Sequence, residues 1–534
     1  MADGATQSCP GPLVLPVIFV PGIMGSRLRA GNDSRWDPPH SAPQDGNMAR
    51  DRSRATDPEI PEEEWRLTLP NIGRGDPTEQ STRDRFVQDE QLRSAGKAAG
   101  AVATWGRLDG AERRQRMIGN PGQPFRQNFL TVDPGNAAHF EGRMAPNLIP
   151  MAVDRGWGGL VWEFYGGFMR WLHYFAAMEI ELPAACASLK VEAWACPYNW
   201  TGDNADAAAL LDRTVSRAVQ EANTEHTPRG ATVLDPIVLT HSMGGLVGRA
   251  WAANNGGNGK AHSIIHGAMP THGSPAAYKR MRAGFEGLGA VVLGLNAAEV
   301  TALLANMPGG LELLPNQFHK DRAGGTKWLE VTGSGGQKLE ELPNGDPYSE
   351  IYLNQTDWWK LVDAALVDPE GNNPGRGFGF FTNNLAKAKA FHTNLGDTRF
   401  HPNTKMFYSD AGGAFRCWDR VEWRCTEGSV TSAAALSALP TNMVADNGTG
   451  RYAFQGTEPG RLWGTNTVDI AAFEIQGPNA NGDATVHTGS GIHVPGTVES
   501  EASRNGYAHD QAYNDASARQ QVSGWIAEMI AAMV

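Results

Sequence analysis

The sequence predicts an α/β fold, in which a mostly parallel central sheet carries helices on both faces and is interrupted by cap or lid insertions. Two observations support this prediction. Short apolar segments of strand length alternate with segments of helical periodicity from residue 13 to residue 268. One apolar segment also runs directly into Thr-His-Ser-Met-Gly at 240–244, where a serine stands among small residues at the start of a helical pattern.

The strands and helices follow from local patterns in chain order. Residues 13–20 are apolar and β-branched and end at Pro21-Gly22, as expected of a buried strand followed by a turn. Residues 205–222 place Leu211 and Val215 on one face, which predicts a helix. In full, strands are predicted at 13–20, 191–196, 236–240, 263–268 and 405–409, and helices at 157–177, 205–222, 244–254 and 516–533.

Two long segments interrupt this alternation. Residues 31–146 are charged and turn-rich, so we predict an insertion that forms part of a cap or binds a partner protein, with helical stretches at 83–93 and 111–117. Residues 275–403 are irregular apart from a helical patch at 284–304, which predicts a cap or lid. The predicted core therefore comprises residues 1–30, 147–274 and 404–534.

Composition narrows the class of protein. The net charge of −12 and the pI near 5.6 argue against a nucleic-acid-binding protein, which usually carries a basic face. The sequence has no uncharged apolar window of about 18 residues, so we expect no membrane span. Residues 1–16 lack the basic and apolar regions of a Sec signal. We therefore expect a cytoplasmic protein or one exported by a non-Sec route.

The cysteines and the glycine-rich segments carry weaker signals. Cys186 with Cys196, and Cys417 with Cys425, are close enough in sequence to form disulfides, and ordinary buried thiols are the alternative. The sequence contains no His-Glu-x-x-His, no Cys-x-x-Cys pair and no P-loop. We expect neither a metal ion nor another cofactor.

Ser242 is the candidate nucleophile. A nucleophile elbow exposes the serine hydroxyl on a tight strand-to-helix turn, which crowds the backbone and requires small neighbours. Gly244 and Gly245 meet that requirement, whereas Thr240 stands where glycine is commonest. His241 is expected to pack within the elbow.

An activated serine needs a base and a carboxylate that orients the base. In a hydrolase sheet of this kind the chain order is serine, acid, histidine. Asp483 lies in a Gly-Asp turn and His509 in a loop before the last predicted helix, so we predict them as acid and base. The competing bases are His487, His493 and His392, and the competing acids are Asp410 and Asp446.

Two backbone N–H groups would stabilise a negatively charged oxygen in the reaction. One belongs to Met243, the residue after the nucleophile. The other is expected from the glycine-flanked loop after the first strand, where Ile23 is the predicted donor. A simple strand-end turn is the alternative interpretation of that loop.

Seven motifs occur in one order along the chain. They are Val20-Pro-Gly-Ile-Met-Gly-Ser26, Pro197-Tyr-Asn-Trp200, His241-Ser-Met-Gly-Gly245, Pro270-Thr-His-Gly-Ser-Pro-Ala-Ala277, Leu313-Leu-Pro-Asn316, Gly482-Asp-Ala-Thr-Val486 and Gly506-Tyr-Ala-His509. Together they resemble the lecithin:cholesterol acyltransferase-like branch of the α/β-hydrolases, which includes lysosomal phospholipase A2 and bacterial lipases. The resemblance spans residues 14–530, except the insertion, and departs at Thr240 and at Asn199, where aspartate is usual.

The resemblance implies an α/β-hydrolase core with a lid and a membrane-facing cap. It carries the nucleophile, acid and base to Ser242, Asp483 and His509, and the oxyanion donors to Ile23 and Met243. It implies a serine lipase or phospholipase that acts on lipid esters, with peripheral membrane contact and no nucleic acid.

Three alternatives remain open at this point. The first is a lipid acyltransferase. The second is an antibacterial lipase delivered by type VI secretion, with an immunity or secretion partner protein. The third is a non-enzymatic lipid- or protein-binding protein.

Overall fold

The structure is a computed structural model that describes most of the chain. It describes residues 11–37, 104–118, 129–140, 144, 146–174, 176–184, 186, 188–286, 290, 292–369, 377–459, 465–495 and 504–534. The helix predicted at 83–93 lies outside these residues. So do residues 1–10, on which most of the expectation about a Sec signal rests.

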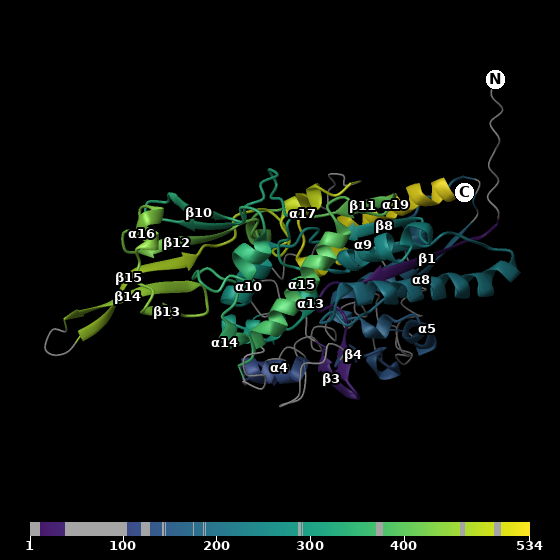
Figure 1. Cartoon of the computed structure of the whole chain (residues 1–534). Coiled ribbons are helices and arrows are strands. Elements are labelled where there is room, and N and C mark those ends of the chain that lie inside the picture. The colour runs from purple at the N-terminus through teal and green to yellow at the C-terminus, as the bar shows by residue number, and fades with distance from the viewer. Residues whose placement is uncertain are drawn as a thin grey trace, which may run out of the picture.

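A parallel sheet lies in the right-hand half of the molecule as Figure 1 shows it. Its strand order is β11-β8-β7-β1-β5, with the short strand β6 paired to the start of β1, and all its pairings are parallel. The strands are β1 (Leu13–Val20), β5 (Leu189–Ala195), β6 (Thr232–Val233), β7 (Ile237–His241), β8 (Ser263–Gly267) and β11 (Thr404–Phe407). The predicted fold class is confirmed.

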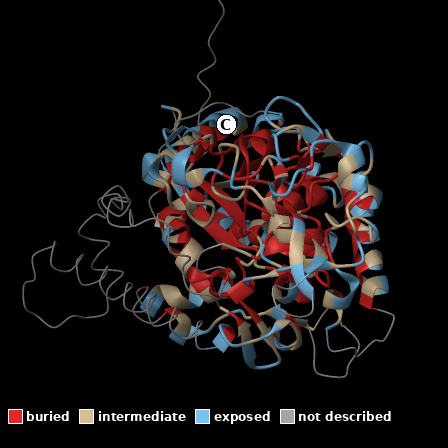
Figure 2. Ribbon diagram, turned by 90° about the vertical axis from the view of Figure 1, so that its left-hand side faces the viewer, coloured by how far each residue is buried: buried red, intermediate tan, exposed pale blue. Residues whose placement is uncertain are grey.

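Helices cover both faces of this sheet because successive residues of a strand point to opposite sides. Ile18 and Val20 of β1 pack in one apolar cluster with α8 (Asn204–His226) and α9 (Gly244–Asn254). Val17 and Phe19 pack in the other cluster with α6 (Trp162–Tyr174) and α19 (Ala516–Met533). Buried residues accordingly fill the interior, and exposed residues lie around it (Figure 2). Of the helices described, none has the length and hydropathy needed to cross a bilayer.

The helix predicted at 157–177 has an irregular start. A 3₁₀ turn η3 (Trp157–Gly159) is followed by α6 and then by α7 (Ala176–Glu179). The break after η3 comes from a tertiary contact: Leu160 is extended and forms a β-bridge with Ser26, and the N–H of Val161 donates to the carbonyl of Gly25. The segment after β1 is thereby fastened to the start of α6.

A second, six-stranded sheet corrects the predicted domain organisation. Its order is β10-β9-β12-β15-β14-β13, and only the β9–β12 pairing is parallel. The strands are β9 (Leu329–Thr332), β10 (Lys338–Leu342), β12 (Val421–Glu427), β13 (Val444–Asp446), β14 (Arg451–Pro459) and β15 (Thr465–Ile475). Residues 404–534 are therefore not core throughout, since four of these strands lie within them and join two strands from 275–403. The β14–β15 hairpin extends away from the rest of the molecule (Figure 1).

The segment 275–403 also contains helices. They are α10 (Pro275–Ala283), α12 (Ala297–Leu304), α13 (Pro308–Leu311), α14 (Ala364–Val367) and α15 (Gly377–Leu395). The described part of the insertion adds α4 (Gly110–Ile118), which packs against α12, and strands β3 (Asp33–Trp36) and β4 (Thr131–Val132), which pair with β2 (Leu28–Ala30).

Of the two alternatives for the close cysteine pairs, neither Cys186–Cys196 nor Cys417–Cys425 forms a disulfide. Cys196, Cys417 and Cys425 are free and buried, whereas Cys186 is disulfide-bonded. Cys196 ends up in the core beside α8, where Thr214 Oγ1 lies 3.6 Å from its Sγ atom and burial raises the pKa of its thiol to about 12. Proximity in sequence is a poor guide here, because Cys186 and Cys196 lie on either side of a buried strand, β5.

Glu312 links the segment after β8 to the core and is fully buried. Its Oε2 atom accepts hydrogen bonds from the side-chain and backbone N–H groups of Asn204, at 2.6 and 3.3 Å. Burial, and then the charge of Asp203, raise the pKa of the Glu312 carboxyl well above its usual value. The folded protein thus holds a proton that an unfolded chain releases near pH ~4.3.

We therefore expect Glu312→Gln to remove part of the pH dependence of stability. Between the unfolded and folded pKa values, the folded state binds more protons, so the free energy of unfolding falls as the pH rises. Glutamine has the shape of the protonated acid and does not ionise. In urea denaturation at about pH 5 and pH 8, the wild type should lose more stability than the variant with rising pH. The exposed Glu458→Gln is the control, and equal slopes for the wild type and Glu312→Gln would contradict the prediction.

Candidate functional site

Ser242 lies on the turn that joins β7 to α9. Its backbone has a φ of 53°, in the left-handed region that non-glycine residues rarely adopt. The turn is held by hydrogen bonds from the N–H of Ser242 to the carbonyl of Gly267, at 2.9 Å, and from the N–H of Gly245 to the carbonyl of Ser242, at 2.8 Å. A strained serine at a strand-to-helix turn is the geometry of a nucleophile elbow.

Thr240 fits below this elbow although it is larger than glycine. Its hydroxyl hydrogen-bonds with Nδ1 of His266 at 2.7 Å, and its methyl group lies against Gly248 of α9. A β-carbon on Gly248 would come within 2.9 Å of that methyl group. The departure from the common motif is thus accommodated by a glycine one helical turn into α9.

His509 and Asp483 lie in hydrogen-bonding order behind Ser242. The Nε2 atom of His509 is 2.7 Å from Oγ of Ser242, and its Nδ1 atom is 2.7 Å from Oδ2 of Asp483. The other carboxylate oxygen of Asp483 accepts from the N–H groups of Thr485 and Val486, at 3.1 and 2.7 Å. The buried carboxylate only accepts, so it fixes the proton on Nδ1 and leaves Nε2 to receive the serine proton.

The competing histidines and aspartates contact groups other than Ser242 and His509. His392 contacts Asn316 Nδ2 and the carbonyl of Glu312, and His493 contacts the carbonyl of Asp321. His487 is buried with its ring centroid 5.1 Å from that of His319. The competing acids form ion pairs, Asp410 with Arg322 and Asp446 with Arg282.

The loop after β1 lies directly against the elbow. A β-carbon on Gly22 would be 2.8 Å from Cβ of Ser242, and one on Gly244 would be 2.5 Å from the carbonyl oxygen of Pro21, so neither position tolerates a side chain. Among the described residues, the N–H groups of Ile23 and Met243 donate to no backbone or side-chain acceptor. The structure therefore leaves two donors beside the serine for an oxygen of a bound substrate.

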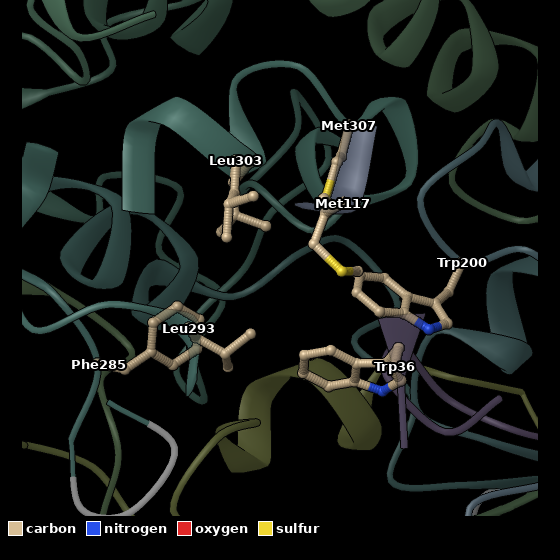
Figure 3. A pocket seen from close by; sticks show the side chains of 8 residues that line it. Trp36, Met117, Trp200, Phe285, Leu293, Leu303 and Met307 are labelled. Carbon is tan, nitrogen blue, oxygen red and sulfur yellow. The ribbon is translucent and has the colours of Figure 1, made fainter. Parts of the chain in front are cut away.

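An apolar pocket adjoins this loop, and the sequence alone does not locate it. Its free volume is about 10 Å³, about that of one water molecule, and it is lined only by apolar side chains, those of Trp36, Met117, Trp200, Phe285, Leu293, Leu303, Leu304 and Met307. The two tryptophans pack with ring centroids 5.0 Å apart and face Phe285 and Leu293 (Figure 3). The indole N–H of Trp36 donates to the carbonyl of Met24, and that of Trp200 to the carbonyl of Ser26. The pocket wall and the loop are thus one hydrogen-bonded unit.

Asn199, which stands where the resembled family has aspartate, makes a contact that aspartate could not. Its Nδ2 atom donates to the carbonyl of Leu130 at 3.0 Å, and its Oδ1 atom accepts from the N–H of Thr201. A carboxylate has no proton to donate. The amide therefore fastens the described end of the insertion to the loop after β5.

One group of side chains in the described residues has the spacing of a metal site. Glu192, Glu225 and His226 bring their donor atoms within 4.8 Å of one another. Arg155 and Lys190 also contact Oε1 of Glu192, at 2.9 and 3.1 Å. Burial alone would raise the pKa of Glu192. The hydrogen bonds from His226, Arg155 and Lys190 and the charge of Arg155 outweigh burial and lower this pKa to about 2. The carboxylate is already neutralised by cations, so the group is a structural ion-pair cluster that does not suit a metal ion.

Comparisons with known proteins support the fold. The sequence matches no protein-family model and no curated protein. Among solved structures, the chain is similar to Tle4 in the crystal structure of the Tle4–Tli4 complex, with a TM-score of 0.67 and 22% sequence identity. The similarity covers 99% of this chain and 100% of that chain. Phospholipase PlaB from Legionella pneumophila matches over 57% of this chain and 77% of its own, at 14% identity and a TM-score of 0.16, too low to indicate a shared fold.

Proposed function

We propose that this protein is a serine lipase or phospholipase that hydrolyses lipid carboxylic esters through an acyl-enzyme on Ser242. The observation that carries the proposal is the unbroken hydrogen-bonded series from Ser242 through His509 to Asp483, beside an apolar pocket. Serine, imidazole and buried carboxylate in this order are the parts of an acyl-transfer site.

The mechanism follows from the positions of these groups. Oγ of Ser242 attacks the ester carbonyl while Nε2 of His509 takes its proton, and Asp483 stabilises the imidazolium. The N–H groups of Ile23 and Met243 stabilise the oxyanion. His509 then protonates the leaving alcohol as its bond to the acyl carbon breaks. Water, deprotonated by His509, attacks the acyl-enzyme, releases the fatty acid and restores the serine.

The pocket supports a lipid substrate. Its wholly apolar lining offers a polar group no hydrogen-bonding partner, and a hydrocarbon chain would enter it as the lining side chains move apart. Because the pocket wall is hydrogen-bonded to the loop that holds Ile23, a chain bound there would lie against that loop. Access to lipid in a bilayer requires peripheral contact with the membrane surface.

We expect Ser242→Ala and His509→Ala to reduce ester hydrolysis on the order of 10⁴-fold or more, because each removes a member of a unit that acts together. The wild type and both variants should be assayed on a panel of phospholipid, triglyceride and lysolipid, with circular dichroism to verify folding. Ser490→Ala, a buried serine that hydrogen-bonds to the backbone of Thr271, is the control. Wild-type turnover in the Ser242 variant would overturn the assignment of the nucleophile.

Adding an alcohol to the same assay separates hydrolysis from acyl transfer. If a sterol or another lipid alcohol competes with water for the acyl-enzyme, labelled phospholipid yields a new ester. If water is the acceptor, the label is recovered as free fatty acid. We expect the free acid to dominate.

We expect Leu293→Trp to change acyl-chain preference. The larger side chain fills part of the pocket, so turnover of a long-chain p-nitrophenyl ester should fall about tenfold or more relative to a short-chain ester. Leu339→Trp, a substitution at a similarly buried leucine in β10, is the control for overpacking. An unchanged long-to-short ratio in Leu293→Trp would remove the pocket from the substrate site.

We further propose that the chain is an antibacterial lipase held by an immunity protein and delivered by a non-Sec route such as type VI secretion. The supporting observation is the fold similarity to Tle4, which was solved in complex with Tli4.

We expect periplasm-directed expression of the wild type, but not of Ser242→Ala, to stop bacterial growth. Growth unaffected by an active, exported wild type would contradict this role and leave the hydrolase assignment standing.

A further inference from the structure

A chain of buried hydrogen bonds joins three segments of the candidate active site that are far apart in sequence. The N–H of Gly22, in the loop after β1, donates to the hydroxyl of Tyr165 in α6 at 3.1 Å. That hydroxyl is 2.7 Å from Nδ1 of His241, the residue before the nucleophile. The Nε2 atom of His241 is 2.7 Å from the backbone carbonyl of His509.

Only one arrangement of protons satisfies every member of this chain. The carbonyl of His509 accepts only, so Nε2 of His241 carries a proton and donates. In the neutral ring Nδ1 then accepts, and the Tyr165 hydroxyl must be its donor. The hydroxyl keeps its lone pairs for the N–H of Gly22. The direction is therefore Gly22 to Tyr165 to His241 to His509.

The surroundings hold His241 neutral. The His241 side chain is buried. This burial, and to a smaller extent the charge of the nearby His509, lower the pKa of His241 well below its usual value. The ring centroids of His241 and His509 are 5.0 Å apart. A second cation at that distance would oppose the imidazolium that forms on His509, whereas a neutral ring fixed as a donor to the His509 carbonyl does not.

We propose that Tyr165 and His241 are positioning residues for the acyl-transfer reaction, holding the Ile23 donor loop and the His509 backbone in register with Ser242. The inference rests on the proposed function. Neither side chain reaches the reacting atoms. They act by fixing the distance between the base and the oxyanion donors, and misplacement by about 1 Å in such a site can cost roughly 10²-fold in rate.

Tyr165→Phe isolates the hydroxyl. The ring is held independently, since it packs edge-on against Phe19 with centroids 4.9 Å apart. We expect kcat for a short p-nitrophenyl ester to fall about 10- to 100-fold, because the loop and the base lose their common anchor. KM should change less than about twofold, since the substrate contacts are untouched.

Tyr278→Phe is a matched control. Its hydroxyl is equally buried, accepts from the indole N–H of Trp423 at 3.2 Å and donates to the carbonyl of Trp359 at 2.6 Å. This variant should lose comparable thermal stability while kcat stays within about twofold of the wild type. Equal losses of kcat in the two variants, or a change in KM alone for Tyr165→Phe, would show a merely structural role and overturn the inference.

His241→Gln provides a conservative rescue. The glutamine amide can still donate to the His509 carbonyl, whereas alanine cannot, so His241→Gln should retain more activity than His241→Ala.

Inactivation rates with a fluorophosphonate, which reacts with the activated serine and needs no lipid, should rank in the same order. If the wild type reacts with the probe but hydrolyses no lipid, the lipid assignment alone fails. If the wild type is inert to the probe, the positioning role fails with it.

Discussion

The site depends on the register between β1 and β7. In this parallel pairing Val20 lies opposite Thr240, so the chain leaves both strands at the same level of the sheet. The donor loop and the nucleophile turn therefore meet, and a β-carbon on Gly22 would come within 2.8 Å of Ser242. A slip of one residue would move the donor loop along the sheet, so that Gly22 would no longer lie against Ser242.

The remaining loops converge on that meeting point from the carboxyl edge of the same sheet. The predicted acid, Asp483, lies in a turn where two N–H groups donate to its carboxylate. The predicted base, His509, begins a short 3₁₀ helix. Ligand sites of open parallel sheets form at this edge, because consecutive strands all end there and their loops lie together. The rigid strands thus fix where these loops meet.

Much of this could be predicted from local sequence. Buried parallel strands are continuous apolar runs, so β1, β7 and β8 were recognisable. The small residues at fixed positions around Ser242 indicated the nucleophile elbow. The second sheet was missed as a unit because the two pairings of β12 are non-local: β12 lies beside β9, about ninety residues earlier in the chain, and beside β15, after β13 and β14. The break before α6 was missed for a similar reason, since Leu160 is extended by its bridge to Ser26 rather than by its own propensity. The roles of Tyr165 and His241 carry no sequence signature, because they depend on contacts between three distant segments.

Strands β12 to β15 of the second sheet lie in one continuous segment of the chain. The chain leaves the core after β11 and returns just before Asp483, and β-bridges between Ala411 and Gly482 and between Cys417 and Ala480 join the outgoing and incoming segments. This segment therefore begins and ends beside Asp483, while β12 is also held by its pairing with β9. The two bridges fix the distance between the ends of the segment. The position of Asp483 is thus independent of the length of the β14–β15 hairpin beyond them.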